Sequence, residues 1–523
     1  MGFLFLILLA SLLGSGLGDD SPILEESGDD PNPPQPEDPL FWEGTAGPDT
    51  FEHDGRGIIS GLGGNDTLEV GGYTRAEGGS GDDNITVNDI SKGFGNSGED
   101  TMIVRNAGIG DGGPGDDIIS AYNQSKAYGG GGEDTMFANR YAEITGGSGD
   151  DTLTAANFAK AGGSLGDDTI VVRDSARGWG GVGEDTMTAS DESTIVGGSG
   201  DDVLNVLGNS LARGQLGDDT FVLYDQAEGY GDSGNDDFTI GANSTAYGGV
   251  GNDTFNDNGN YYGAGRGTGY GGAGNDEFMG YGHADYYGES GDDTYEAAVA
   301  IAADKFYGGL GEDVARLGQG GWAEGGQGTD SLTTDTSGTV TGDSGDDSIT
   351  MTRALSVDAE LGVIENPETD ARVVATGGAG KDTFTLDDSI FSANVSFIDG
   401  EAPEAGSTAE ADYMSKLMPS AFDVGEITDF DPAEDTLVVE LPSGDYDLSS
   451  ITTANPPGET AVNLIITLSN TVDATAPDVV RTLKLSGIDS FDADSILLVA
   501  KPLEPPVVLP PIPPVVVDPV PVV

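Results

Sequence analysis

A short Gly-Asp motif recurs nineteen times between Gly44 and Asp388, and it constrains the fold more than any other feature of the chain. One copy reads Gly-Gly-Ser-Gly-Asp-Asp-Thr-Leu over residues 146–153. An internal repeat of this length is typical of a solenoid, in which each copy forms one coil. The sixth motif position is Asp in every copy: Asp49, Asp66, Asp83, Asp100, Asp117, Asp134, Asp151, Asp168, Asp185, Asp202, Asp219, Asp236, Asp253, Asp276, Asp293, Asp313, Asp330, Asp347 and Asp382.

The spacing of these aspartates sets the coil length. From Asp49 to Asp253 the step is 17 residues twelve times in succession, and the later steps are 23, 17, 20, 17, 17 and 35. The last step is two periods plus one residue. It therefore predicts one additional coil without the motif, in which Ile364 occupies the position of the motif Asp.

The columns of the repeat predict the structure of one coil. With the motif Asp as position zero, position +2 is large and apolar in every copy except Ala315, and position +4 is mostly apolar. Such alternation is typical of a half-buried strand. Position +6 is usually Gly, Asn or Asp, which favours a tight turn, with Arg140 as the clearest exception. Small residues at +8 and +10 predict a second inward-facing strand.

These columns predict an all-β fold, a parallel β-roll or β-helix solenoid with two short strands and two turns in each 17-residue coil. No single coil can bury its apolar face, so stability must come from stacking neighbouring coils. Roughly twenty coils at about 4.8 Å each would form a rod about 95 Å long.

The aspartate column also predicts a metal. A turn alone would explain one Gly-Asn-Asp, but nineteen aspartates in register place one carboxylate per coil along one edge, about 4.8 Å apart. Like charges at this distance repel and raise each other's pKa. A hard cation between successive coils removes the conflict, because Ca2+ binds carboxylate and backbone carbonyl oxygens. Glycine lets the backbone turn its carbonyl groups toward the ion.

The motif resembles the Gly-Gly-x-Gly-x-Asp-x-U-x repeat of the RTX (repeats-in-toxin, haemolysin-type) calcium-binding proteins. The resemblance covers about two thirds of the chain. It implies a parallel β-roll with Ca2+ held in the Gly-rich turns, and it implies that the nineteen motif aspartates supply the side-chain oxygens.

The chain departs from the family in one respect, because the full motif occurs once per coil rather than twice. We therefore expect one row of ions. Fifteen of the eighteen junctions keep the 17-residue step, which predicts about 15 sites. Pro48, Thr329 and Lys381 occupy a position that is usually Asp, Asn or Glu, so weak sites are expected there.

Composition limits the classes of partner. The chain has 92 acidic and 20 basic residues among 523, a net charge of −72. Nucleic acid is an unsuitable partner because phosphate contacts need a basic face. The periodic Asp and Gly indicate a chain that is disordered without metal and folded with it. The absence of Cys excludes disulfides, thiolate metal sites and a lipid-modified N-terminal Cys.

The N-terminal flank is apolar and then acidic. Residues 3–13 form an apolar run with the length of a signal-peptide core, without a basic residue before it or a clear Ala-x-Ala site after it. We expect a secretion signal or a short membrane anchor here, which would be the protein's one contact with a membrane. Segment boundaries are expected at 1–18 (signal or anchor), 19–43 (acidic Pro-rich linker), 44–388 (calcium-binding β-roll), 389–420 (hinge), 421–500 (C-terminal β domain) and 501–523 (Pro/Val-rich tail).

The C-terminal segment is predicted to cap the rod. Strand signals occur at 436–441, 462–468 and 481–485. Ile-Thr-Asp-Phe at 427–430, followed by Asp-Thr-Leu at 435–437, resembles the capping region of RTX proteins exported by type I secretion. A cap is needed because an open solenoid end exposes unpaired strands. The Pro/Val tail departs from the usual end of a type I substrate, which leaves an N-terminal or a C-terminal export signal open.

The sequence gives little evidence of a catalytic site. His53 and His283 are its two histidines, and no His-Glu-x-x-His is present, which excludes a zinc protease of that kind. Gly-x-Ser-x-Gly at 162–166 and the dinucleotide-like glycines at 93–98 and 178–183 fall in phase with the repeat and are attributed to it. Neither flank is long enough for an ordinary catalytic domain.

Three functions therefore stay open. The first, which we favour, is a secreted, non-enzymatic calcium-binding rod that acts outside the cell or attached to its surface, with a polysaccharide or a protein of the surface or matrix as its partner. The second is a polysaccharide-acting enzyme with its site on the β-helix. The third is an ice-binding rod, which would need a flat Thr-x-Thr ladder where only scattered pairs are seen. The stretch 261–270, rich in Gly and Tyr, is expected to be an insertion loop, with tyrosines nearby at 286, 287, 295 and 307 as aromatic cover over the broken register.

Overall fold

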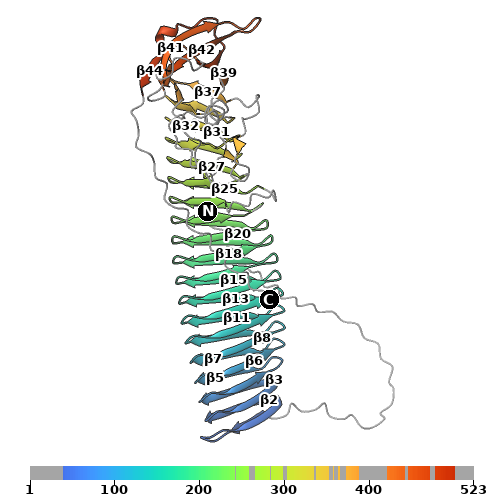
Figure 1. Cartoon of the computed structure of the whole chain (residues 1–523). Coiled ribbons are helices and arrows are strands. Elements are labelled where there is room, and N and C mark those ends of the chain that lie inside the picture. Colours follow the sequence, from blue (N-terminus) through green and yellow to red (C-terminus); the bar gives the residue numbers. More distant parts are fainter. Residues whose placement is uncertain are drawn as a thin grey trace, which may run out of the picture.

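A computed structural model describes residues 39–500 apart from 242, 258–265, 283, 299–302, 335–336, 353–356, 359–362, 365–372, 388–420, 442–445 and 471–477. The expected signal or anchor, most of the acidic linker, the hinge and the tail lie outside the described residues. The described part is almost entirely β-structure, with one 3-10 turn at Ala493–Ser495. It forms the predicted solenoid rod (Figure 1).

The rod has two parallel sheets, each built from one strand per coil. Sheet 1 consists of the strands that follow the motif Asp, and sheet 2 of the strands that lead into the motif. In the first two coils one strand runs through both sheets, as β2 (Thr50–Gly63) and β3 (Thr67–Ser80). The separate strands of sheet 1 are β4 (Asn84–Val87), β6 (Thr101–Arg105), β8 (Ile118–Tyr122), β10 (Thr135–Asn139), β12 (Thr152–Ala156), β14 (Thr169–Arg173), β16 (Thr186–Ala189), β18 (Val203–Leu207), β20 (Thr220–Tyr224), β22 (Asp237–Ile240), β24 (Thr254–Asp257), β26 (Glu277–Gly280), β28 (Thr294–Ala297), β30 (Val314–Arg316), β32 (Ser331–Thr334), β34 (Ser348–Thr352), β38 (Thr383–Asp387), β40 (Thr436–Leu441) and β44 (Leu497–Ala500).

Sheet 2 forms the other side of the flattened coil. Its strands are β1 (Leu40–Glu43), β5 (Lys92–Ser97), β7 (Ile109–Pro114), β9 (Lys126–Gly131), β11 (Glu143–Ser148), β13 (Lys160–Leu165), β15 (Arg177–Val182), β17 (Thr194–Ser199), β19 (Leu211–Leu216), β21 (Glu228–Ser233), β23 (Thr245–Val250), β25 (Thr268–Ala273), β27 (Asp285–Ser290), β29 (Lys305–Leu310), β31 (Trp322–Gln327), β33 (Thr339–Ser344), β37 (Val373–Ala379), β39 (Ala421–Ile427) and β43 (Val479–Ser486).

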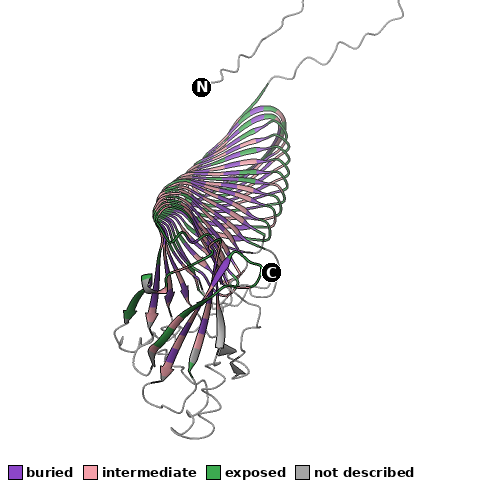
Figure 2. Cartoon of the chain, turned by 90° about the horizontal axis from the view of Figure 1, so that it is seen from above, coloured by how far each residue is buried: buried purple, intermediate pink, exposed green. Residues whose placement is uncertain are grey.

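Each strand pairs with its equivalent one coil away. Thr135 of β10 pairs with Thr152 of β12, and Glu143 of β11 pairs with Lys160 of β13, so the register repeats every 17 residues. The column predictions are therefore confirmed. Viewed along the rod, successive coils are rotated so that their strands form a fan (Figure 2). This rotation is the twist expected of stacked strands.

The core lies between the two sheets. Side chains at +2 and +4 of sheet 1, such as Leu153 and Ala155, are fully buried, as are the small residues at +8 and +10 of sheet 2, such as Ala159 and Ala161. Apolar burial of this kind is the main favourable term in folding. In later coils the core becomes aromatic, and the rings of Phe221, Phe238, Phe255 and Phe278 stack from coil to coil with centroids 4.5 to 5.0 Å apart.

The sizes of the residues at +4 and +10 compensate each other within a coil. Gly178 lies opposite Val172, where a Cβ atom on the glycine would lie 3.1 Å from Val172 Cγ1. In the next coil Ala189 takes the +4 position and the larger Ile195 takes the +10 position, and both are fully buried. The volume of the core is thereby kept nearly constant along the rod, as close packing requires.

Irregular steps do not interrupt the stacking. The extra residues of the 23- and 20-residue steps fall between β24 and β25 and between β28 and β29, and β24 still pairs with β26 and β28 with β30. The prediction that the 35-residue step hides a coil without its motif is wrong. β33 pairs directly with β37 and β34 with β38, so the surplus belongs to an insertion that contains the antiparallel pair β35 (Val357–Asp358) and β36 (Val363–Ile364).

The C-terminal segment continues both sheets. β39 and β40 pair in parallel with β37 and β38, and β43 and β44 add a further layer. Strands β41 (Tyr446–Ala454) and β42 (Ala461–Asn470) then pair antiparallel with each other and with β43. At the opposite end, the ring of Trp42 stacks on Phe51 with centroids 4.4 Å apart and packs against the core. Across the described residues no helix has the length and apolar character needed to cross a membrane.

Candidate metal centre

The motif aspartates form one continuous ladder along one edge of the rod. Each motif Asp begins a coil directly before its sheet 1 strand. The backbone N–H of Asp134, for example, donates to Oδ1 of Asp151 in the next coil at 2.8 Å. All eighteen junctions from Asp49 to Asp382 contain this bond, with N···O distances of 2.7 to 3.0 Å. One carboxylate oxygen of each aspartate therefore holds the preceding coil.

The second carboxylate oxygen has no partner. In the seventeen aspartates from Asp66 to Asp347, Oδ2 is buried and accepts no hydrogen bond. Each of these side chains is at most 2% exposed. A buried carboxylate oxygen without a donor is costly, because burial removes its water and nothing replaces it. A column of seventeen such atoms requires an explanation beyond turn geometry.

A glycine in each motif leaves room beside this oxygen. A Cβ atom on Gly129 would lie 2.1 Å from Oδ2 of Asp134 and 2.6 Å from the carbonyl oxygen of Gly146 in the next coil. The carboxylate oxygen and the carbonyl oxygen therefore converge on a space that only glycine leaves open. Gly112 stands in the same relation to Asp117 and to the carbonyl oxygen of Gly129.

This donor set fits a hard cation. It combines a carboxylate oxygen with backbone carbonyl oxygens, the ligands that Ca2+ prefers, and it offers no nitrogen or sulfur. Across the described residues no group of three or more His, Cys, Asp or Glu side chains is arranged to hold a metal ion. A metal at this edge would therefore be held by one carboxylate from each coil together with the backbone.

Without a cation, the ionised form of the buried carboxylates is unfavourable. Burial raises the pKa of Asp117, Asp168 and Asp202 to about 7 and that of Asp236 to about 8. The backbone N–H bond to Oδ1 opposes this rise, whereas the neighbouring motif carboxylates add to it. A cation would stabilise the ionised form and lower these pKa values.

The two ends of the ladder are closed by the chain itself. Oδ2 of Asp49 accepts from the N–H of Thr45 at 2.5 Å and from its hydroxyl at 3.0 Å. At the other end, Asp382 N–H donates to Oδ1 of Asp435 at 3.1 Å, and Oδ2 of Asp435 accepts from the N–H of Asp431 at 2.7 Å. Asp435 is thus a twentieth rung that the motif search missed. Its one sequence signal was the Asp-Thr-Leu triplet that it shares with the repeat.

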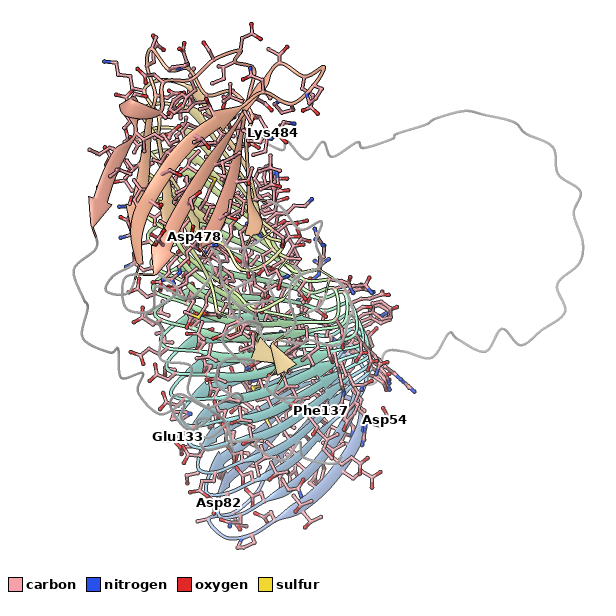
Figure 3. All side chains as sticks on the ribbon, turned by 45° about the horizontal axis from the view of Figure 1, so that its top comes forward. Asp54, Asp82, Glu133, Phe137, Asp478 and Lys484 are labelled. Carbon is pink, nitrogen blue, oxygen red and sulfur yellow. The ribbon has the colours of Figure 1, made fainter. Side chains whose placement is uncertain are left out.

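A second, exposed row lies beside the buried ladder, at the position before each motif Asp. The N–H of Glu184 donates to Oδ1 of Asp167 at 2.8 Å, and that of Asp167 donates to Oδ1 of Asp150 at 2.9 Å. These bonds run in the direction opposite to those of the buried ladder. Figure 3 shows two members of this row, Asp82 and Glu133, on one edge of the rod and Asp54 on the other. Lys381 keeps its place in the row through its N–H, which donates to Oδ1 of Asp346 at 2.9 Å.

The far turn, between sheet 1 and sheet 2, has a different chemistry. Its two central residues have positive φ in many coils, as in Asn157 (55°) and Phe158 (64°), or Arg140 (54°) and Tyr141 (64°). Two consecutive left-handed residues are typical of a type I′ turn. Within the described far turns no buried carboxylate lacks a hydrogen-bond partner. The single row of sites stays a prediction, and this difference between the two edges favours it.

The expectation of about 15 sites assumed that the irregular steps interrupt the ladder. That assumption is wrong, because Asp253 still bonds to Asp276, Asp293 to Asp313 and Asp347 to Asp382, whereas the number of sites stays a prediction. Seventeen rungs have a buried, unpartnered Oδ2. Asp382 has the same relation to Gly377, whose Cβ would lie 2.2 Å from its Oδ2.

Tyrosines on either side of the expected insertion belong to sheet 2. Residues 258–265 lie outside the described structure, but Tyr230, Tyr247, Tyr270, Tyr287 and Tyr307 form one outward stack on sheet 2 with centroids 4.6 to 4.9 Å apart. Their ring faces are used in stacking on each other, so only their edges and hydroxyl groups face solvent. Such a stack offers no free ring face to a sugar.

Comparisons with known proteins do not assign a family. No family model and no curated protein matches the chain. Among solved structures, the chain is similar to a hyperactive, Ca2+-dependent, β-helical antifreeze protein from an Antarctic bacterium, with 16% sequence identity over 60% of this chain and 85% of that chain and a TM-score of 0.22. A likeness of this size leaves the ligand of the aspartate ladder to be inferred from its own geometry.

Proposed function

We propose that the chain is a calcium-binding repeat protein of the RTX kind, whose solenoid folds when Ca2+ occupies the motif edge. The observation that carries this proposal is the column of seventeen buried Oδ2 atoms without hydrogen-bond partners. Oδ2 of each motif Asp and the carbonyl oxygens of the motif glycines would hold the ions. Bound Ca2+ would supply the positive charge that lets neighbouring carboxylates stay ionised at close spacing.

The net charge supports coupling between binding and folding. The chain carries −72 charges, and eighteen Ca2+ ions would offset 36 of them. Without ions, the buried carboxylates oppose the folded state, because each must either lose its charge or stay ionised beside its neighbours. The binding free energy of the ions then becomes folding free energy.

We further propose that the rod is secreted and non-enzymatic, and that it acts outside the cell or on its surface. An unfolded chain where free Ca2+ is low would be competent for export, and a calcium-rich exterior would fold it. The charge of the holo rod and its repetitive surface support a structural or binding role toward a polysaccharide or protein of the surface or matrix. A shallow hollow of about 430 Å³ at the far turns, beside Phe158 and Asp174, has exposed carboxylates that stay solvated, which does not favour acid–base catalysis.

The decisive experiment is a Ca2+ titration of the purified full chain, followed by circular dichroism for β-structure and by calorimetry for stoichiometry. We expect a cooperative transition from a disordered chain to β-structure, with one ion bound at each rung whose Oδ2 has no partner in the chain. A parallel titration with Mg2+ is the control, since a smaller ion that demands octahedral geometry should bind far more weakly. A chain that is fully folded in chelator and binds only one or two ions would contradict the proposal.

The alternative function, a polysaccharide-acting enzyme on the rod, has its own test. Uronate polysaccharides incubated with the Ca2+-loaded chain should show no change in chain length or reducing ends. Turnover that survives repurification of the protein would replace the non-enzymatic proposal.

A further inference from the structure

The outward side of sheet 1 carries a long stretch without charge. Positions +1 and +3 point outward in each coil, and in the nine coils from Asp83 to Asp219 none of these eighteen residues is Asp, Glu, Lys, Arg or His. Thr occupies +1 in four successive coils, at Thr135, Thr152, Thr169 and Thr186. We call these eighteen positions the uncharged face.

The limits of the uncharged face are abrupt. Glu69 takes the +3 position one coil before it, and Asp237 takes the +1 position one coil after it. Charged residues make up 21% of the chain, and acidic residues outnumber basic ones by 92 to 20. An outward surface in such a protein is expected to be rich in carboxylates, so their absence over nine coils needs a reason.

The +1 column of the face is exposed, the +3 column is mostly half-buried, and both columns include apolar side chains. Ile118 is 56% exposed and Val203 is 38% exposed. Phe137 lies between the two edges of the rod in Figure 3 and contacts Tyr122 of the preceding coil, with ring centroids 5.8 Å apart. Twelve of the eighteen residues are Thr, Ser or Asn, so the face is not an apolar patch, but its exposed apolar side chains would gain free energy by leaving water in an interface.

Two arginines border the face on its far-turn side. Arg105 and Arg173 occupy the outward +5 position of their coils. In the described part of the chain neither forms an ion pair, although most surrounding charges are acidic. On the other side, the face is bordered by the exposed acidic row, which includes Asp116 and Asp150. The far-turn border therefore carries two cations beside exposed carboxylates such as Asp174, whereas the other border is acidic in all nine coils.

We propose that the uncharged face is the dimer interface of the Ca2+-loaded rod, and that its partner is a second copy of this chain. A second copy has the same coil spacing and the same twist, so two rods that wind around each other can keep these rows of side chains in contact over several coils. A planar crystal, such as ice or a crystalline polysaccharide, cannot follow a face that rotates from coil to coil (Figure 2).

Charge selects the orientation of the two rods. If a twofold axis runs along the rods, the acidic row of each copy faces the far-turn border of the other, where Arg105 and Arg173 lie. If the axis runs across the rods, the two acidic rows face each other and repel. The parallel arrangement is therefore expected, because complementary charges favour one register and like charges exclude the other.

The size of the face permits a specific but moderate interface. Nine coils at about 4.8 Å span roughly 40 Å, and a strip about 15 Å wide would bury roughly 1,200 Å² in total. This lies at the lower end of the range for specific protein–protein interfaces. Dissociation constants near micromolar are expected.

Sedimentation velocity of the full chain in Ca2+, from about 1 to about 100 μM, tests the proposal. We expect a monomer–dimer equilibrium in this range. Thr152→Glu with Thr186→Glu places charge in the centre of the face and should leave a monomer. The matched control is Thr67→Glu with Thr294→Glu, because these residues occupy the same exposed +1 column outside the nine coils. Circular dichroism should show the same β-content in all three proteins.

A second pair of variants probes the charge contacts and the orientation. Arg105→Gln with Arg173→Gln should weaken the dimer at least tenfold with no effect on folding. The chain lacks Cys, so Glu52→Cys and Thr453→Cys allow one dye at either end of the rod. Parallel rods should transfer energy between copies labelled at the same end.

Several outcomes would overturn the proposal. One is a monomer at about 100 μM in Ca2+, and another is a dimer that persists when charge is placed in the face. Thermal hysteresis that vanishes in the Thr152→Glu, Thr186→Glu protein, with no dimer in either protein, would assign the face to ice instead. Because dimerisation is scored only in folded protein, failure of this inference is distinguishable from failure of calcium-coupled folding.

Discussion

The backbone N–H of Asp236 donates a 2.8 Å hydrogen bond to Oδ1 of Asp253, whereas Oδ2 of Asp253 is buried without a partner. The two oxygens of this carboxylate thus differ in their hydrogen bonding. Oδ1 ties neighbouring coils together, and Oδ2 has no donor in the chain and is the oxygen that the proposed cation would bind. Removing the side chain should therefore affect both stacking and metal binding.

Asp151→Ala is expected to remove one ion and to raise the Ca2+ concentration at the folding midpoint. The substitution also leaves the N–H of Asp134 without its acceptor, a loss that costs about 1–3 kcal/mol for a buried group. Calorimetry and chemical unfolding in Ca2+ measure the two effects. The control is Asp150→Ala in the exposed row, where solvent replaces the lost contact and the ion count should not change. Equal effects of the two variants would contradict the assignment of roles.

Gly129→Ala should disable one site without touching a carboxylate. The new Cβ would lie 2.1 Å from Oδ2 of Asp134, so the side chain or the strand must shift. We expect one ion fewer and a lower melting temperature in Ca2+. Gly162→Ala is the matched control, because no atom lies within 4 Å of its Cβ position and its φ is not left-handed. That variant should be neutral or stabilised by about 0.4–1 kcal/mol.

Calorimetric stoichiometry should give 17 or 18 Ca2+ ions per chain. Seventeen rungs have a buried, unpartnered Oδ2, and Asp382 has the same glycine beside it. Asp49 and Asp435 are excluded, because their own turns already satisfy Oδ2. A measured value near 15 would mean that the irregular steps do interrupt the row.

Acid should stabilise the metal-free rod. Burial raises the folded-state pKa of Asp236 to about 8 and that of Asp117 to about 7, above the ordinary Asp value of 3.8. A raised carboxyl pKa means that the folded state binds more protons than the unfolded chain between about pH 4 and pH 8. Stability in chelator should therefore rise as the pH falls through that window.

Circular dichroism in chelator at pH 8 and pH 5.5 measures this effect as a gain of β-structure at the lower pH. In Ca2+ the trend should reverse, because protons compete with the ion for the same oxygens. A metal-free chain with less β-structure at pH 5.5 than at pH 8 would show that the carboxylates are not strained in the fold.

Much of this architecture could be predicted from the periodicity alone. The strands of sheet 1 were predicted from the alternation of apolar and polar residues around Leu153 and Ala155, and those of sheet 2 from small residues such as Ala159 and Ala161. Burial of one side of a strand makes every second residue apolar or small, so the pattern can be seen in the sequence. The nineteen aspartates in register predicted a ladder at one edge. These features depend on local patterns repeated many times, which is why single exceptions such as Ala315 did not obscure them.

Other features depend on contacts between distant residues. The 35-residue step, read as two periods plus one residue, predicted a further coil around Ile364. Instead, β34 pairs directly with β38, and Ile364 lies in an insertion between them. Asp435 was missed as a rung because it follows Asp382 after 53 residues and no glycine motif precedes it. The difference between Oδ1 and Oδ2 required the geometry of adjacent coils.

All variation in step length falls at the far turns or beyond β34, and the motif edge keeps its register throughout. Extra residues can therefore be added at the far turns without changing the register of the motif edge. A segment inserted between β24 and β25 lengthens the polypeptide but adds nothing to the length of the rod. New sequence can therefore be inserted at the far edge at a chosen position along the rod, while the proposed row of ions would depend only on the number of coils.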